Sequence, residues 1–335
     1  MVSLGEVLLR FDPENERIHT ARMFRVFDGG AEYNVARGLA KVFMQKTVIV
    51  TALADNALGR LAEDFIRQAG VDTSEIAWCE SAETRNGIYF IEQGFGLRGP
   101  ASYFDRAFTA VSQLKKGEIN WEEIYKRNGT RWFHTSGVFA GLSDTTPKVA
   151  KEAMQAARAN GAIVSYDLNY RDSLWKNKGA RDAANAVNRE LLPFADVVFG
   201  VLDFDPRLSV FDAEEFRQGA ERMLGEFANL KIIASTLREV HSASRHDLSA
   251  VCFADNEIFK AKNYKNIDVL DRVGSGDSFA SGLIFGLLTE KGFQYSVECG
   301  AAHACLAMTS PGDNSSATLT EITNLMSGGA GDVNR

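Results

Sequence analysis

The sequence predicts an α/β protein with three layers, in which helices cover both faces of a mainly parallel central sheet and a small β-sheet lid lies beside it. Three observations predict this class: strand-like and helical segments alternate, two aromatic segments interrupt the alternation, and 335 residues, 45% of them hydrophobic, suffice for one large core. We expect a single domain over residues 1–326 and a flexible, glycine-rich tail at 327–335.

The alternation is regular through the middle of the chain. Each short apolar run is followed by a segment of helical periodicity, a pattern typical of parallel strands connected by helices. The predicted strands are 47–53, 130–137, 162–169, 195–200 and 230–235, and the predicted helices are 58–69, 145–160, 180–192 and 213–228. Ligands of such sheets bind beyond the carboxyl ends of the strands, so we expect the site at that edge.

Two segments, 7–30 and about 85–112, do not follow this pattern. Both are rich in aromatic residues and turns, and both alternate without helical period. They predict strands outside the main sheet, which could pair into a lid that excludes water from a reaction. A pair of surface hairpins is the alternative.

The amino-acid composition excludes some classes of function and indicates where in the cell the protein is located. The net charge is −7 without a block of Lys or Arg, which argues against a nucleic-acid partner. No apolar run reaches the roughly 18 residues of a membrane span, and acid and proline near the amino end argue against a secretory signal. Four cysteines without CxxC spacing suggest reduced thiols. We expect a cytoplasmic protein with no membrane partner.

The strongest motif is "DRVGSGDSFASG" at 271–282. Gly274, Ser275 and Gly276 precede an apolar helix, so their N–H groups and the helix dipole could hold a phosphate. The carboxylate of Asp277 would repel that phosphate, unless it accepts a proton from an attacking hydroxyl. The pattern therefore indicates phosphoryl transfer, and a simple helix cap is the alternative.

This motif resembles the carboxyl-terminal signature of the ribokinase-like (phosphofructokinase-B) carbohydrate kinases, D-x-x-G-[AS]-G-D-[ASTV]-F. Three further segments resemble 2-keto-3-deoxygluconate kinases within that family: "FDGGAEYNVARGLAKV" (27–42), "VSYDLNYRDSLW" (164–175) and "TSPGDNSSAT" (309–318). The resemblance covers about residues 1–326 in family order. It implies the ribokinase-like fold, with Gly274, Ser275, Gly276 and Asp277 as catalytic residues.

The amino-terminal segment places small and polar residues at a helix start. Its glycines permit a close approach of the backbone, and Glu32 and Asn34 could hold sugar hydroxyls, or could only complement the helix dipole and solvent. The resemblance assigns contacts with the sugar to Gly29, Gly30, Ala31, Glu32, Asn34 and, in the late turn, Asp313.

Polar residues also follow the strand predicted at 162–169. Asp167, Asn169 and Arg171 alternate there, so all three point toward one side of the sheet edge. A guanidinium pairs well with a planar carboxylate, although a surface ion pair would also explain Arg171. The resemblance implies that Asn169 and Arg171 contact both the substrate and the nucleotide phosphate.

The second lid segment carries a looser resemblance. Tyr89, Phe104 and Arg106 correspond to the aromatic pair and the arginine that contact substrate in the family. Phe104 and Asp105 stand where two tyrosines are usual, which leaves the exact sugar open.

Two departures from the family pattern concern the nucleotide side. The strand predicted at 230–235 does not continue into the usual Lys-x-Gly-x-x-Gly turn, because 231–247 contains no glycine. Ser235, Thr236 and Arg238 are the candidates that remain there, and Arg238 could replace backbone N–H groups or lie solvated at the surface. The usual Asn-x-x-Glu is also incomplete in 200–208, where Asp203 or Asp205 could help to hold Mg²⁺.

Together these features predict a sugar kinase that uses ATP and Mg²⁺. We expect it to phosphorylate a primary hydroxyl of a keto sugar acid, with 2-keto-3-deoxygluconate as the preferred substrate, and the resemblance suggests a homodimer formed through the lid. The alternatives are a kinase of another sugar or of a nucleoside, and a catalytically silent sugar sensor.

Overall fold

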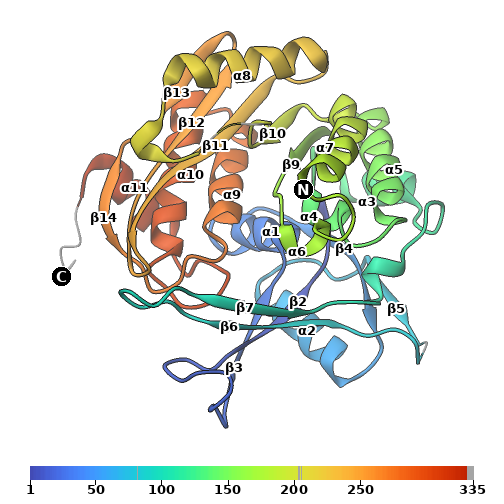
Figure 1. Cartoon of the computed structure of the whole chain (residues 1–335). Helices are drawn as coiled ribbons and strands as arrows, with labels where there is room; N and C mark the ends of the chain where they lie inside the picture. The colour runs from blue at the N-terminus through green and yellow to red at the C-terminus, as the bar shows by residue number, and fades with distance from the viewer. Residues whose placement is uncertain (81, 203, 205, 330–335) are drawn as a thin grey trace.

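A large mixed sheet forms the centre of the fold in the computed structural model, which describes residues 1–80, 82–202, 204 and 206–329. Within this range its strands are ordered β13-β12-β11-β10-β9-β8-β1-β4-β5, with β14 paired to β12 (Figure 1). The strands are β1 (Val2–Leu4), β4 (Val48–Ala54), β5 (Ile76–Cys79), β8 (Trp132–Ser136), β9 (Ile163–Asp167), β10 (Val197–Phe199), β11 (Ile232–Ser242), β12 (Arg245–Ala254), β13 (Glu257–Lys260) and β14 (Tyr264–Asp268). The strands from β5 to β11 are parallel, and β12 pairs antiparallel with its neighbours.

Helices cover both faces of this sheet. They are α1 (Ala31–Lys41), α2 (Ala57–Gln68), α3 (Trp121–Asn128), α4 (Gly137–Ala140), α5 (Thr146–Ala159), α6 (Asp172–Trp175), α7 (Ala180–Leu191), α8 (Ala213–Glu226), α9 (Ser275–Leu288), α10 (Phe293–Ala307) and α11 (Leu319–Ser327). One core cluster packs α3, α5, α7 and α8 against the sheet, and another packs α1, α9, α10 and α11. Successive side chains of a strand point to opposite faces of the sheet, so Val198 lies in the first cluster and Val197 in the second. The predicted three-layer class is therefore confirmed.

The predicted strand and helix positions agree with the structure to within a few residues, except at one edge of the sheet. There β11 continues to Ser242, well past the predicted end at 235, and turns directly into β12. The antiparallel strands β12, β13 and β14 were not predicted. In the segment 231–247, where the family usually has a glycine turn, this chain instead forms the end of a long hairpin.

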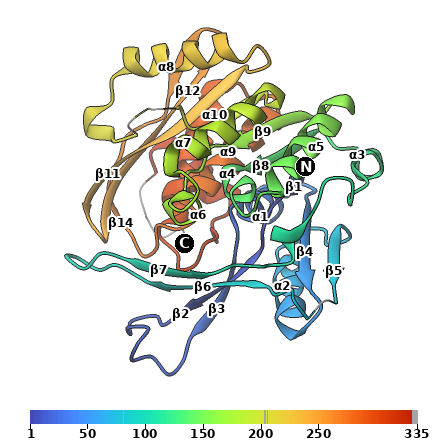
Figure 2. The same cartoon turned by 45° about the vertical axis from the view of Figure 1, so that its right-hand side comes forward.

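A separate small sheet collects the two segments that break the alternation. Its order is β3-β2-β6-β7 among the described residues, with β2 (Leu8–Asp12), β3 (Arg25–Gly29), β6 (Gly87–Glu92) and β7 (Ala101–Asp105). The strands β2 and β6 run parallel, and the outer pairs are antiparallel. In Figures 1 and 2 this sheet lies below the main sheet, across the amino-terminal end of α9.

None of the helices in the described residues combines the length and the apolar character that a membrane span requires.

Candidate active site

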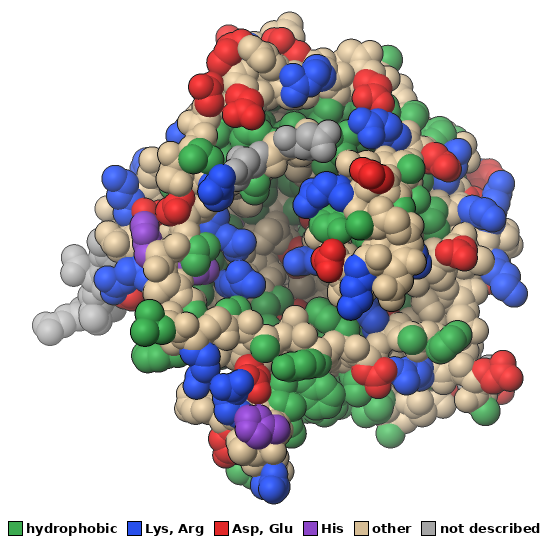
Figure 3. All heavy atoms as spheres, viewed as in Figure 1, with side chains coloured by type: hydrophobic (Ala, Val, Ile, Leu, Met, Phe, Trp, Pro, Cys, Tyr) green, Lys and Arg blue, Asp and Glu red, His purple; other side chains and the backbone are tan. Residues whose placement is uncertain are grey.

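A cavity of about 840 Å³ lies between the small sheet, the carboxyl ends of β9, β10 and β11, and the start of α9. In Figure 3 the corresponding face of the molecule is hollowed, and Lys and Arg side chains surround the hollow. Most of the predicted site residues line this cavity: Gly30, Ala31, Asn34, Tyr89, Phe104, Arg106, Asn169, Arg171, Ser235, Thr236, Arg238, Gly274, Ser275, Gly276, Asp277 and Asp313. The fold thus brings together residues from both ends of the chain.

The first turn of α9 presents free backbone donors to the cavity. Within the described part of the chain, no acceptor takes a hydrogen bond from the N–H groups of Ser275, Gly276 or Asp277. Gly274 caps the helix with a φ of 76°, and a Cβ at this position would overlap the carbonyl oxygen of Asp313. Glycine is therefore required at 274, and the open N–H groups form a site suited to an anion.

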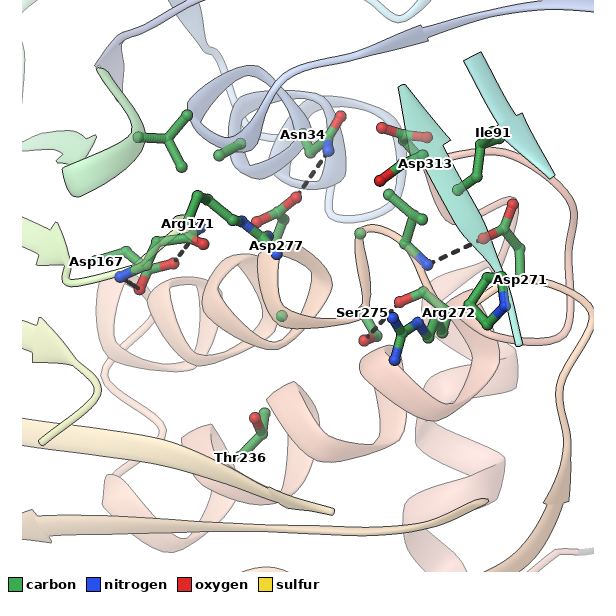
Figure 4. A pocket seen from close by; sticks show the side chains of 18 of the residues that line it. Asn34, Ile91, Asp167, Arg171, Thr236, Asp271, Arg272, Ser275, Asp277 and Asp313 are labelled. Atoms are coloured by element: carbon green, nitrogen blue, oxygen red, sulfur yellow. Dashed lines mark hydrogen bonds between the residues drawn. The ribbon is translucent and has the colours of Figure 1, made fainter. Parts of the chain in front are cut away.

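Asp277 lies at this helix start and is only 9% exposed. Its Oδ2 accepts a hydrogen bond from Asn34 Nδ2 at 2.7 Å (Figure 4). Burial raises the pKa of Asp277 to about 8, and the nearby carboxylates of Asp167 and Asp313 add to the rise, although Asn34 and Arg171 oppose it. A carboxyl group with a pKa near neutrality is suited to exchange a proton with a substrate hydroxyl.

The end of β9 supplies a second polar group to the cavity. Asp167 accepts hydrogen bonds from the backbone N–H of Asn169 at 3.1 Å and from its Nδ2 at 3.2 Å. Burial raises the pKa of Asp167 to about 6, although Arg171 opposes the shift. Figure 4 shows the Arg171 side chain directed toward Asp277.

Two more arginines lie on the nucleotide side. Arg238 lies on β11, and Arg272 lies in the turn before α9. Burial lowers the pKa of Arg238, and the neighbouring charges of Arg272 and Arg171 lower it further, so both of these guanidinium groups are close enough to repel that of Arg238. In the described part of the chain no carboxylate forms an ion pair with any of the three. Such a cluster is suited to a polyanion. Our sequence prediction missed Arg272, although it stands inside the recognised motif.

The small sheet contributes an aromatic and basic wall. The rings of Tyr89 and Phe104 stack with their centroids 5.0 Å apart, and Arg106 lies over Phe104. Arg106 Nη2 donates to Glu6 Oε2, whereas the buried Nε of Arg106 has no partner among the described residues. The Tyr89 hydroxyl donates to Asp313 Oδ2. Glu6, which the sequence did not single out, therefore holds Arg106 against the cavity wall.

Two predicted sugar contacts lie outside the cavity lining. Glu32 is fully buried, where its Oε1 accepts hydrogen bonds from Ser136 Oγ and from the Phe139 N–H, the latter at 3.1 Å. Burial raises its pKa to about 7, although these hydrogen bonds oppose the rise. Gly29 lies behind Asp313, where there is no space for a side chain. Neither residue lines the cavity, so direct sugar contacts of Glu32 and Gly29 stay predictions, and in this structure both residues lie behind the wall.

The two candidate Mg²⁺ ligands of the 200–208 segment, Asp203 and Asp205, fall outside the described residues. Among the residues that are described, no group of three or more His, Cys, Asp or Glu side chains is placed to hold a metal ion.

The layered fold and the cavity correspond to a small-molecule kinase, in which an anion site at a helix start lies beside a buried carboxylate. The model of the pfkB family carbohydrate kinases matches residues 1–201 and 244–320, so the chain belongs to this family and is a carbohydrate kinase. The family predicted from the sequence motifs is therefore confirmed. The unmatched interval, 202–243, contains most of the segment where the glycine turn is missing.

Several relatives are similar over nearly the whole chain. A crystal structure of a 2-dehydro-3-deoxygluconokinase from Thermotoga maritima is 35% identical, with a TM-score of 0.88, and the match covers 97% of this chain and 98% of that one. A 2-dehydro-3-deoxygalactonokinase from Haloferax volcanii is 29% identical, covering 100% of this chain and 99% of the relative. A 5-dehydro-2-deoxygluconokinase from Clostridium botulinum is 27% identical over 92% of this chain and 87% of its own length.

Proposed function

We propose that the protein transfers the γ-phosphoryl group of ATP to a primary hydroxyl of a keto sugar acid. The preferred substrate is 2-keto-3-deoxygluconate, also called 2-dehydro-3-deoxygluconate, and the product is its 6-phosphate. The observation that carries this proposal is the position of Asp277. This buried carboxyl group lies beside the open N–H groups of α9 and shares one cavity with Arg171 and Arg106.

In this proposal Asp277 is the general base. It accepts the proton of the sugar hydroxyl as that oxygen attacks the γ-phosphorus, while the bond from phosphorus to the leaving ADP oxygen breaks. The N–H groups of Ser275 and Gly276 and the guanidinium of Arg171 stabilise the charge on the transferring group. Catalysis of this kind depends mainly on positioning and on electrostatic stabilisation. Asn34 keeps the carboxyl group oriented through its hydrogen bond.

Acid recognition is assigned to Arg106 and to Arg171, the second of which also contacts the transferring group in this proposal. Arg106 is held by Glu6 through one terminal nitrogen, which leaves its buried Nε to bind the substrate carboxylate. A guanidinium that is already fixed loses little freedom when it binds. Tyr89, Phe104, Asn34 and Asp313 would surround the sugar carbons and hydroxyls. The names of the relatives support this assignment, because each of the three acts on a keto deoxy sugar acid by name.

Nucleotide binding is assigned to β11 and the turn before α9. Arg238 and Arg272 would take the place of the glycine turn, together with Ser235 and Thr236 on β11. Guanidinium groups bind phosphate oxygens strongly, and within the described part of the chain neither arginine of this pair forms an ion pair. Support for ATP also comes from a kinase in this fold that was crystallised with ATP and Mg²⁺.

The residues around Asp167 fit a magnesium ion. In phosphoryl transfer Mg²⁺ is usually held by one or two carboxylates together with phosphate oxygens and water, so a dedicated cage is not required. Asp167 supplies such a carboxylate at the cavity edge. When bound there, the ion would neutralise charge on the nucleotide phosphates.

The small sheet is proposed to act as a lid and as a dimer interface in a cytoplasmic homodimer. It bounds the cavity, and its other face carries a cluster of three partly exposed rings, Phe11, Phe24 and Phe90. Light scattering after size exclusion tests the oligomer: a dimer is expected, and a monomer at micromolar concentration would refute it.

A substrate screen tests the proposed reaction. Purified protein is incubated with ATP, Mg²⁺ and one sugar or sugar acid at a time, and ADP release is measured, with Asp277→Asn as the matched inactive control. We expect the highest kcat/KM with 2-keto-3-deoxygluconate. The galactonate form, its C4 epimer, is the second candidate, because the Haloferax volcanii relative matches the whole chain. A preference for neutral sugars or nucleosides would overturn the assignment of a sugar acid. Sugar binding without any ADP release would support a silent sensor.

A further inference from the structure

Arg10 is a buried cation that the proposed reaction does not use. It lies on β2 with no exposed surface and does not line the cavity. Its Nη1 donates to Asp313 Oδ1 at 2.8 Å, and its Nη2 donates to Asp12 Oδ2 at 2.6 Å and to Asp271 Oδ2. Burying a charge is costly unless it is paired, so these contacts fix the guanidinium in one position.

Two of the three carboxylates belong to turns that build the active site. Asp271 begins the turn before α9 and accepts hydrogen bonds from the N–H groups of Val273 at 3.0 Å and Gly312 at 3.2 Å. The backbone of Asp313 packs against Gly274 so closely that a Cβ at 274 would overlap its carbonyl oxygen. Arg10 therefore fastens both turns to the same strand of the small sheet.

The small sheet contacts the same turns through other side chains. Tyr89 stands opposite Arg10 in the β2–β6 pairing, and its hydroxyl donates to Asp313. Leu8, Tyr89 and Ile91 form an apolar cluster against which Val273 packs. Tyr89 also faces the cavity on its sugar side. The same side-chain contacts therefore hold both the sugar-facing part of the small sheet and the start of α9.

We propose that Arg10 is a positioning residue for phosphoryl transfer. It holds the start of α9 at a fixed place relative to the small sheet, and so it sets how the transferring phosphoryl group faces the sugar hydroxyl. This inference rests on the proposed function for its kinetic readout only. Arg10 touches neither substrate in this account and acts through Asp271 and Asp313.

A comparison within the cluster separates positioning from general stability. Asp271→Asn keeps the size of the side chain but weakens the link from Arg10 to the turn. Asp12→Asn is the matched control, because Asp12 also pairs with Arg10 but, in the part of the chain that the structure describes, otherwise binds only Gln93 and the Glu14 N–H. Arg10→Lys keeps the charge but loses the planar fork that reaches several carboxylates at once.

The expected result is a split between these variants. Asp271→Asn and Arg10→Lys lower kcat at least about tenfold at saturating substrates, with ATP affinity changed less than about threefold, because a small misplacement of reacting groups is costly. Asp12→Asn keeps kcat within about threefold of wild type. Hydrogen–deuterium exchange, which needs no substrate, should show faster exchange of the 271–278 backbone in the first two variants and none of that change in Asp12→Asn.

Three outcomes would overturn the inference. Equal losses of kcat in Asp271→Asn and Asp12→Asn would mean that the cluster only stabilises the fold. Wild-type turnover in Arg10→Lys and Asp271→Asn below their melting temperatures would mean that the turn needs no such support. Unchanged exchange at 271–278 in these two variants would show that Arg10 does not hold the turn. If the wild-type protein phosphorylates no keto sugar acid, the proposed substrate fails, while the exchange measurement still decides the role of Arg10.

Discussion

Replacing Asp277 by Asn should stabilise the protein while it removes most of its activity. The side chain is 9% exposed, and its burial raises the carboxyl pKa from 3.8 to about 8. At pH 7 the unfolded chain therefore carries an ionised carboxylate, whereas the folded chain keeps the group mostly protonated. Each pH unit above the unfolded pKa costs about 1.4 kcal/mol of folding free energy, so the total is about 4 kcal/mol at pH 7.

The sign of this contribution fixes its pH dependence. The folded pKa is raised, so the folded state binds more protons than the unfolded state between pH 4 and 8, and stability falls as pH rises through that window. At pH 5 the cost has shrunk to about 2 kcal/mol. Asparagine carries no charge, and its Oδ1 can still accept from Asn34, so Asp277→Asn removes the cost without leaving Asn34 unpaired.

The expected shift in melting temperature follows from the size of the chain. An unfolding entropy of about 2.1 cal/mol/K per residue over 335 residues converts 4 kcal/mol into a rise of about 6 °C at pH 7, and about half of that at pH 5. Because asparagine cannot accept the hydroxyl proton, kcat should fall by roughly 10²–10⁴ while sugar binding is retained.

The assay combines differential scanning fluorimetry at pH 5 and pH 7, calorimetric sugar binding and the ADP-release rate. Asp64→Asn, an exposed position on α2, is the matched control and should change none of these quantities. Turnover within a few-fold of wild type would refute the role of Asp277 as base. An unchanged or lower melting temperature at pH 7 would refute the argument from burial.

Three further predictions concern ionisation and charge. The kcat/KM for the sugar should rise with pH and level off above about 8, because the free enzyme must lose the Asp277 proton. Asn34→Ala should move the midpoint of this pH–rate profile upward, since the substitution removes a hydrogen bond to the ionised form of Asp277. Arg171→Ala should raise KM for the sugar acid far more than for a neutral analogue such as fructose. Equal losses for both would remove Arg171 from acid recognition and leave it only a role at the phosphate or in the fold. Arg238→Ala should weaken ATP binding by about tenfold or more in calorimetry and leave sugar binding unchanged, as expected for a lost charge-assisted contact; an unaltered ATP affinity would contradict this role.

Local patterns in the sequence were sufficient for most of the fold. Apolar runs separated by amphipathic segments predicted the parallel part of the sheet. A strand in such a sheet is buried on both faces, so nearly all of its residues are apolar. The hairpin of β11 and β12 was missed for a physical reason. Its outer half mixes polar and apolar residues, and β12 pairs there with β14 as well as with β11, so its burial depends on a strand from another part of the chain.

The sequence predicted those parts of the site whose residues belong to one segment. It was less informative where contacts between distant segments determine the position of a side chain. Gly274 to Asp277 stand together in the sequence and together in the cavity. The full burial of Glu32 was not apparent from the sequence, because its partners, Ser136 and Phe139, lie more than 100 residues away. Arg10 was missed for the same reason, since Asp271 and Asp313 follow it by 261 and 303 residues.

The stability cost and the catalytic value of Asp277 have one physical origin. A carboxylate with the ordinary pKa of 3.8 would be a weak base toward a sugar hydroxyl, and general-base catalysis is most efficient when the base has a pKa near the working pH. Burial beside Asp167 and Asp313 moves the pKa toward that value, and Asn34 and Arg171 keep it from rising further. A variant that relieves the burial of Asp277 should therefore gain stability and lose activity together. Altering Asn34 rather than Asp277 should instead lower both quantities, because a higher pKa of Asp277 gives a less stable protein at pH 8 and a slower one at pH 7.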